Sequence, residues 1–133
     1  MGANLSDTAK ELIDGRNFAT VATINSSNGA PHASTMWITR DGDDLLFSIT
    51  TTRKKYANLL ADPRVSILVP KPDPQQGYVE VRGKAEITEQ GGRDLINRLY
   101  NKYIGPGEYA WDPADAVRVV VRVTPEHIVQ NDQ

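Results

Sequence analysis

The sequence predicts a mainly β protein: an antiparallel split β-barrel of six to seven strands with peripheral helices. Short runs rich in β-branched residues recur along the 133 residues, which is typical of strands. Asn-Gly and Asp-Gly steps lie between them and favour hairpin turns. Apolar residues at helical spacing occur in short insertions between these runs. Strands joined by hairpins, with inserted helices, favour an antiparallel barrel over an alternating parallel sheet.

The first half of the chain is expected to form a helix followed by strands. Residues 5–14 read as a helix, with Ser6 as the N-cap and Gly15 as the stop signal. Three strands follow, at residues 18–24, 31–39 and 45–50. Turn sequences separate them at residues 25–29 and 41–43. We expect these three strands to pair in order, as an antiparallel meander.

The second half is expected to alternate helices with strands. A helix over 53–61 ends before Pro63, because the residue before proline avoids the helical region. Thr88 is the expected N-cap of a second helix that runs to about residue 104. The remaining elements are a strand at 65–69, a polar loop at 70–77 and strands at 78–87 and 117–123. Pro125 is expected to end the last strand.

Composition excludes several classes of function. The chain has 24% charged residues and a net charge of −2, which argues against a nucleic-acid or membrane-binding surface. It has no cysteine, so disulfides and thiolate chemistry are excluded. Acidic residues among the first 15 positions argue against a secretory signal, and no run approaches the roughly 18 apolar residues of a membrane span. We expect a soluble, cytoplasmic protein without nucleic-acid or membrane partners.

The basic triplet Arg53-Lys54-Lys55 is the most informative segment for function. Cations at a helix N-terminus are disfavoured by about 0.3–1 kcal/mol each, and such local conflicts often mark functional sites. A bound anion would reverse the effect, and the hydroxyls of residues 50–52 would add donors. A phosphate fits this description better than a carboxylate. The alternative is that the triplet forms an ordinary solvated surface.

Other candidate residues have two interpretations each. Trp37 either stacks on a bound ring or fills the core, and Trp111 either borders a substrate site or interface or packs on the barrel. His32, Tyr78 and Tyr109 are candidate proton donors, but we assign no catalytic acid, and His127 is placed in a terminal tail. The aspartates at 41–44 are expected in a turn for backbone reasons, so no metal site is predicted.

Several of these segments together resemble the pyridoxamine 5′-phosphate oxidase-like flavin-binding split barrels. The closer resemblance is to the F420-dependent flavin/deazaflavin oxidoreductases of the B type. It covers about residues 8 to 123 and rests on the order and spacing of the runs at 18–23, 28–32, 36–37, 41–43, 52–55, 58–59 and 62–65. The resemblance implies that residues 1–133 form a single split-barrel cofactor-binding domain.

The resemblance also implies a homodimer with each cofactor in a groove between the subunits. It places Arg53, Lys54 and Lys55 on the cofactor phosphate, with Asn58 in the same pattern. It places seven residues along the ring system: Ser34, Thr35, Met36, Trp37, Ser48, Ile49 and Thr50. The partner subunit would contribute from the loop near 76–79, chiefly Gln76 and Tyr78. The anionic tail of F420 would favour a wider basic path, which Arg53, Lys54, Lys55 and Arg64 could supply.

The implied activity is an oxidoreductase that uses reduced coenzyme F420 to transfer a hydride to a small organic substrate of the enone, quinone or tetrapyrrole type. One alternative is an FMN-dependent oxidoreductase of the same fold. Another is a non-enzymatic protein that binds a cofactor or a haem-related molecule. Vitamin B6 oxidation is not expected, because the arginine and leucine-lysine spacing of those enzymes and their C-terminal segment are missing. No glycine fingerprint for a nicotinamide cofactor is present.

Overall fold

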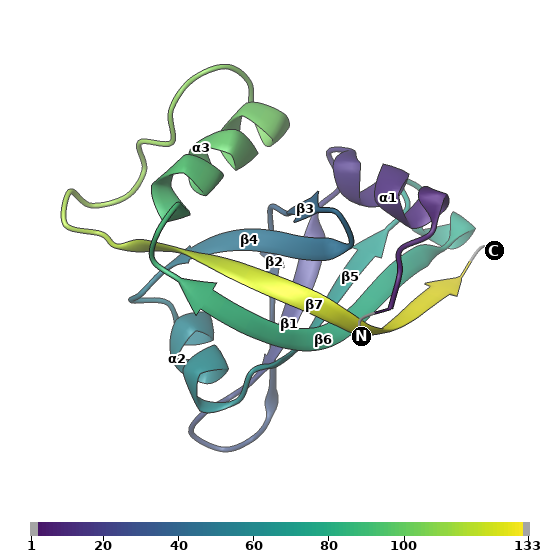
Figure 1. The fold of residues 1–133 in the computed structure, drawn as a ribbon, viewed down its shortest axis with the longest axis horizontal. Coiled ribbons are helices and arrows are strands. Elements are labelled where there is room, and N and C mark those ends of the chain that lie inside the picture. The colour runs from purple at the N-terminus through teal and green to yellow at the C-terminus, as the bar shows by residue number, and fades with distance from the viewer. Residues whose placement is uncertain (1–2, 132–133) are drawn as a thin grey trace.

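The computed structural model describes residues 3–131 as a seven-stranded antiparallel sheet with three α-helices (Figure 1). The strands are β1 (Ala19–Ile24), β2 (Pro31–Met36), β3 (Thr39–Asp41), β4 (Asp44–Thr50), β5 (Arg64–Pro70), β6 (Tyr78–Thr88) and β7 (Arg118–Asn131). The helices are α1 (Asp7–Asp14), α2 (Lys54–Ala61) and α3 (Gly92–Tyr103), with a 3-10 turn η1 (Pro74–Gln76). This confirms the predicted fold class.

The strand order is β2-β1-β5-β6-β7-β4-β3, and the described sheet is open, with β2 and β3 at its edges. The strand predicted over 31–39 is interrupted at Trp37 and Ile38. Its first part pairs with β1 and its second part with β4, so the chain crosses from one edge of the sheet to the other at this point. The two predicted hairpins, β1–β2 and β3–β4, are confirmed, but the continuous strand that would join them into a meander is wrong, because β4 pairs with β3 and β7 and not with β2.

Two apolar cores hold the sheet together. Alternate residues of β1, β5, β6 and β7 point inward, and with Phe47 and helix α1 they form the main core. On the other face of β4, Leu46 packs against Leu95, Ile96 and Leu99 of α3. Because both faces of β4 are covered, residues 45–50 are all buried, whereas a strand with one face exposed would alternate.

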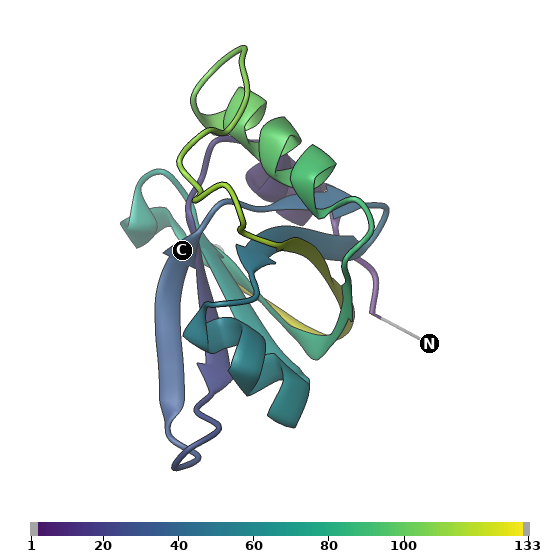
Figure 2. The same ribbon diagram turned by 90° about the vertical axis from the view of Figure 1, so that its left-hand side faces the viewer.

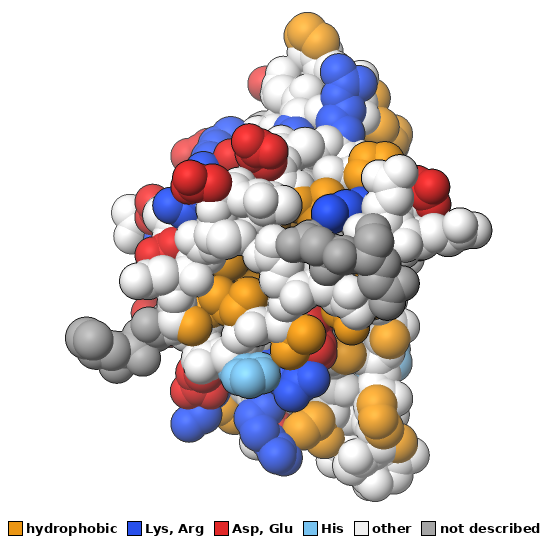
Figure 3. All heavy atoms as spheres, turned by 90° about the vertical axis from the view of Figure 1, so that its right-hand side faces the viewer, with side chains coloured by type: hydrophobic (Ala, Val, Ile, Leu, Met, Phe, Trp, Pro, Cys, Tyr) orange, Lys and Arg blue, Asp and Glu red, His pale blue; other side chains and the backbone are white. Residues whose placement is uncertain are grey.

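Helices α2 and α3 lie on opposite sides of β4. Figures 1 and 2 both place α3 and its following loop on one side and α2 on the other. Ser6 caps α1 as predicted, since its Oγ accepts from the Ala9 amide at 3.1 Å. The face opposite to that of Figure 2 mixes basic, acidic and apolar side chains (Figure 3). None of the helices within residues 3–131 has the length and apolarity needed to cross a membrane.

Two predicted boundaries in the second half are wrong. Thr88 ends β6, and the N-cap of α3 is Gly91, whose positive φ of 87° suits glycine. Pro125 does not end β7, which continues to Asn131. Pro125 lies opposite Gly83, next to a register shift between Arg82 and Gly83, and such irregular positions are where a sheet tolerates proline. His127 accordingly lies in β7, paired with Arg82, rather than in a terminal tail.

Candidate functional site

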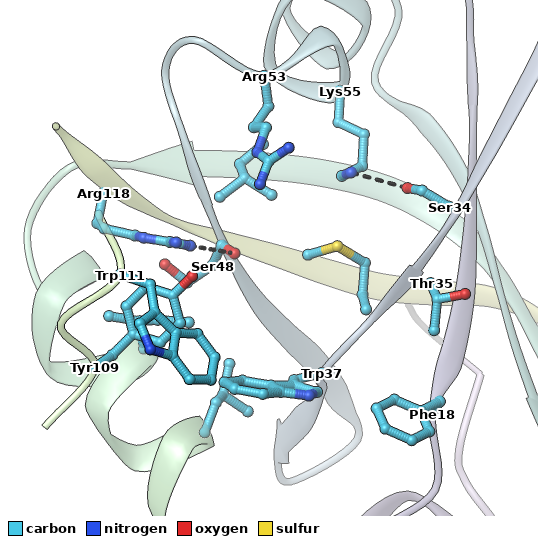
Figure 4. Close-up of a pocket in the computed structure, with 14 residues that line it drawn as sticks. Phe18, Ser34, Thr35, Trp37, Ser48, Arg53, Lys55, Tyr109, Trp111 and Arg118 are labelled. Atoms are coloured by element: carbon cyan, nitrogen blue, oxygen red, sulfur yellow. Dashed lines mark hydrogen bonds between the residues drawn. The ribbon is translucent and has the colours of Figure 1, made fainter. Parts of the chain in front are cut away.

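A cavity of about 320 Å³ opens where the sheet is split, between β2 and β4 (Figure 4). Within the described chain, β3 covers β4 along Asp44–Leu46, so the same edge of residues 47–50 has no neighbouring strand. The free edge of β2 lies across the gap, and the crossover at Trp37 joins the two. The cavity is lined by Phe18, Ser34, Thr35, Met36, Trp37, Ser48, Ile49, Arg53, Lys55, Ile96, Leu99, Tyr109, Trp111 and Arg118.

The cavity, a wedge between the edges of β2 and β4, exposes backbone as well as side chains. Unpaired strand edges present rows of amide donors and carbonyl acceptors. One of them is already used, because the carbonyl of Ser48 accepts from Arg118 Nη1 at 3.1 Å. A planar heterocycle in the wedge would meet donors and acceptors from two strands. Six of the seven residues predicted along the ring system line this cavity; Thr50 does not.

The basic end of the cavity is formed by Arg53 and Lys55, whose side chains point into it from the start of α2 (Figure 4). Lys55 is 8% exposed, and its Nζ donates to Ser34 Oγ at 2.8 Å. Burial, followed by the charge of Arg53, lowers the pKa of Lys55. Among residues 3–131, neither cation forms an ion pair with a carboxylate. A buried cation without a counter-charge is unfavourable unless a ligand supplies one.

The backbone at the start of α2 adds to this basic end. Arg53 is the N-cap residue, and no side chain in the described part of the protein caps the helix. The nearby hydroxyls do not serve as caps, since Thr50 Oγ1 and Thr52 Oγ1 share a hydrogen bond of 3.1 Å. Of the first-turn amides, that of Tyr56 donates to the Arg53 carbonyl at 3.0 Å, whereas no described side chain caps those of Lys54 and Lys55. Together with the two cations, these uncapped amides favour an anion with several acceptor oxygens.

Three other predicted residues lie outside the cavity. Lys54 Nζ reaches the hydroxyls of Ser26 and Ser27 in the β1–β2 turn, at 3.4 and 3.2 Å. Asn58 is fully buried; its Oδ1 accepts from the Ser26 amide and its Nδ2 donates to Thr23 Oγ1, both at 3.0 Å. Both side chains thus hold the β1–β2 turn against α2. Thr50 is buried beside the helix start.

Gln76 and Tyr78 lie in η1 and β6 and do not line the cavity of their own chain. The prediction that they act from a partner subunit stays a prediction. Of the candidate proton donors, Tyr109 lines the cavity, whereas His32 does not. His32 Nδ1 is buried and has no hydrogen-bond partner in the described part of the molecule. Within residues 3–131, no group of three His, Asp or Glu side chains is arranged to hold a metal ion.

The side of the cavity opposite the cations is an aromatic wall, formed by Trp37, Tyr109 and Trp111. The ring centroids lie 5.1 Å apart for Tyr109 and Trp111 and 6.3 Å apart for Trp37 and Trp111. Behind it, Tyr103 stacks on Trp37 with centroids 5.5 Å apart. Trp37 therefore packs on α3 and also borders the cavity, and its stacking on a bound ring stays a prediction.

The loop that carries Tyr109 and Trp111 is fixed by Asp112. Its carboxylate accepts from Arg118 Nε at 2.7 Å and from Nη2 at 2.8 Å, and Arg93 lies 3.2 Å away. The Arg118 guanidinium holds the pKa of Asp112 below its usual range. Arg118 also lies over the Tyr109 ring, 4.8 Å from its centroid. These contacts attach the loop to β4 and β7.

Four lining residues were missed by sequence reasoning: Phe18, Ile96, Leu99 and Arg118. The two aliphatic residues were visible as one side of a helix, but their contact with β4 is tertiary. Arg118 carried no separate signal, because its partner Asp112 sits in an irregular loop six positions earlier. Phe18 was predicted only as the first residue of a strand; it lies just before β1 and is 57% exposed.

Comparisons with known proteins agree with this architecture. A solved structure named F420 Reductase is 33% identical, with a TM-score of 0.81 over 94% of this chain and 98% of the other. A conserved hypothetical protein of Mycobacterium tuberculosis is 26% identical, with a TM-score of 0.79 over 96% and 85%. The General Stress Protein 26 of Bacillus anthracis str. Sterne shares the fold at 21% identity and a TM-score of 0.73 over 93% and 91%.

No curated protein matches the sequence. The family model described as pyridoxamine 5′-phosphate oxidase matches residues 5–132, nearly the whole chain. This match and the F420 Reductase structure confirm the resemblance inferred from the sequence. With its split antiparallel sheet and the cavity at the split, the chain belongs to the pyridoxamine 5′-phosphate oxidase family.

Proposed function

We propose that this oxidoreductase-family protein is an F420-dependent reductase that transfers a hydride to a small organic substrate. The observation that carries the proposal is Lys55, which is buried beside Arg53 at the edge of the cavity and has a hydroxyl but no carboxylate as its partner among the described residues. The 33% identity to a structure named F420 Reductase supports the choice of cofactor. The anion that this basic end favours is a phosphate, which F420 carries.

The residues present fit such a cofactor. Lys55 and Arg53 would hold the phosphate, together with the first-turn amides of α2. The free edges of β2 and β4 would orient the ring, and Met36 and Ile49 would exclude water from part of its surface. Reduced F420, when bound, would supply a hydride and be left oxidised, and the reduced double bond would take its one proton from solvent. We assign no protein group to that proton.

FMN is the alternative cofactor, because its phosphate would meet the same cations. A wider basic path for the F420 tail through Arg53, Lys54, Lys55 and Arg64 stays a prediction. Arg64 is exposed and pairs with Asp62, with Nη2 and Oδ2 at 2.7 Å. The preference for F420 therefore rests on the relative named F420 Reductase rather than on a second basic patch.

The proposal predicts turnover with reduced F420. Reduced F420 and an acceptor are mixed without oxygen, and the return of oxidised-cofactor absorbance is followed with and without protein. We expect a rate increase that saturates with F420, a much smaller one with reduced FMN, and loss of the F420 effect in Lys55→Met. An equal rate with and without protein across enones, quinones and tetrapyrroles would contradict catalysis and leave the binding-protein alternative.

A further inference from the structure

We propose that the aromatic wall binds the hydride acceptor and selects flat, uncharged, conjugated molecules, with Trp111 as the specificity-determining residue. The inference deepens the proposed function and rests on it. Trp111 is unusually exposed for a large apolar side chain, at 65%, and it lines the same cavity as the cofactor-binding candidates. Large exposed apolar side chains gathered at a cavity are typical of ligand surfaces.

The wall is preformed, because the loop that carries it is bonded to α3 and β7. Asn97 Oδ1 accepts from the Tyr109 amide at 2.9 Å, and Asn101 Nδ2 donates to the carbonyl of Gly107 at 3.0 Å. The Asp112–Arg118 pair fixes the segment that follows Trp111. A rigid surface loses little conformational freedom when a ligand binds, and so it contributes more to affinity.

The three side chains of the wall carry no charge. Arg118, which lines the cavity beside them, is paired with Asp112, and the two side chains are 7% and 10% exposed. Arg93, the second cation on that carboxylate, is 45% exposed and does not line the cavity. The unpaired cations, Arg53 and Lys55, lie at the other side of the cavity (Figure 4). A charged group on the wall would lose hydration without gaining a partner. The part of a ligand that contacts Trp111 is therefore uncharged.

The arrangement of rings favours a flat ligand. Tyr109 and Trp111 meet at an interplanar angle of 67°, and Trp37 and Trp111 at 51°. Among the described residues no ring is stacked on Trp111, because its contacts with Trp37, Tyr100 and Tyr109 are tilted or edge-on. Aromatic pairs at 4.5–7 Å stabilise one another by about 0.5–1.5 kcal/mol. Trp37 is already stacked on Tyr103, so Trp111 supplies the available face.

Binding without cofactor provides the test. Calorimetry measures the Kd of menadione, a planar uncharged quinone, for the wild type, Trp111→Ala and Trp111→Phe. Ile104→Ala is the matched control, since Ile104 is 52% exposed near the same loop but does not line the cavity. We expect about a tenfold weaker Kd for Trp111→Ala, as for loss of one stacked aromatic contact, and near wild-type values for Trp111→Phe and Ile104→Ala.

Two further readouts separate this inference from the proposed function. In Trp111→Ala the Kd for F420 should stay within twofold of the wild type, and the KM for menadione should rise while kcat holds. Unchanged menadione affinity, or loss of F420 affinity in Trp111→Ala, would overturn the acceptor role of the wall. Absence of F420 binding by the wild type would overturn the proposed function and, with it, the acceptor role.

Discussion

Lys55 is a buried ammonium group whose sole hydrogen-bond acceptor in the described structure is a neutral hydroxyl, Ser34 Oγ. Most lysines avoid such positions, because burial without a partner disfavours the charged form. Its neighbour Lys54, by contrast, is exposed and reaches two serine hydroxyls on a turn. The sequence shows both residues as members of one basic triplet, and their different environments separate a candidate ligand group from a surface group.

Replacing Lys55 tests its role directly. Lys55→Met should weaken F420 binding by about 1.5–3 kcal/mol, since a hydrogen bond to a charged group is lost. The same change should raise the free energy of unfolding without cofactor, because an unpaired buried charge is removed. The measurements are a fluorescence titration and urea denaturation. Lys54→Met is the matched control, and an equal loss of affinity in the two variants would refute the distinction drawn here.

The pH dependence of binding has a defined sign. Burial lowers the pKa of Lys55 in the free protein, and a bound phosphate would raise it again. Affinity should therefore be full below the free-protein pKa and decline as the pH rises through it. Lys55→Arg should bind with an affinity that stays flat over the same range, because a guanidinium remains protonated. Parallel pH profiles of the two proteins would exclude Lys55 as the titrating group.

At the scale of elements, the irregular loop between α3 and β7 is held by an ion pair rather than by regular structure. The side chains of Asp112 and Arg118 are nearly buried, and the pair connects the loop to the carbonyl of Ser48 on β4. Arg93 of α3 joins from the other side. The pair therefore connects the loop to β4, β7 and α3 around the cavity. Its loss should lower the stability of the fold and change the position of Trp111.

Asp112→Asn should lower the free energy of unfolding by about 2–3 kcal/mol at pH 7, since Arg118 loses its buried partner. The pKa of Asp112 is depressed in the folded state, so its contribution is complete above the unfolded value of about 4 and is lost as the pH falls through the folded value. Urea denaturation at pH 7 and pH 3 should show the difference from wild type shrinking at pH 3. Exposed Asp115→Asn is the control, and a similar loss in both variants would argue against the pair.

Element by element, the sequence predicted what local chemistry determines. The Ser6 cap, the start of α2 at the basic triplet and the strands with β-branched runs follow from propensity and turn residues. The break at Trp37–Ile38 and the continuation of β7 past Pro125 depend on which strand lies opposite, and pairing is not encoded locally. The same reason hid Arg118, whose position at the cavity depends on a tertiary ion pair and on strand pairing.

At the scale of the whole molecule, the cavity lies at the split of an open sheet, and β2 is an edge strand. Exposed edges favour association with another chain. We infer a homodimer in which the partner subunit adds Gln76 and Tyr78 to the cofactor groove. These two residues do not line the cavity of their own chain, so their effect on binding distinguishes a shared site from a self-contained one.

The inferred dimer predicts that a change at Tyr78, outside the cavity of its own chain, weakens cofactor binding. Analytical ultracentrifugation should give twice the mass of one chain at the concentrations used for binding. Tyr78→Ala should weaken F420 binding about tenfold while the oligomeric state is kept, as expected for loss of one aromatic contact. Gln75→Ala, at an exposed neighbouring position, serves as the control. A monomer that binds F420 with full affinity would contradict the shared site.

The central claim is that Arg53 and Lys55 hold the phosphate of a deazaflavin cofactor. The most direct measurement is a fluorescence titration of the wild-type protein with F420 and, separately, with FMN, repeated for the double variant Arg53→Ala/Lys55→Met. We predict saturable binding of F420, weaker binding of FMN, and loss of F420 binding in the double variant. Tight binding of FMN together with weak binding of F420 would indicate that the protein uses FMN. Equal affinity of wild type and double variant for F420, or binding of neither cofactor, would contradict the claim.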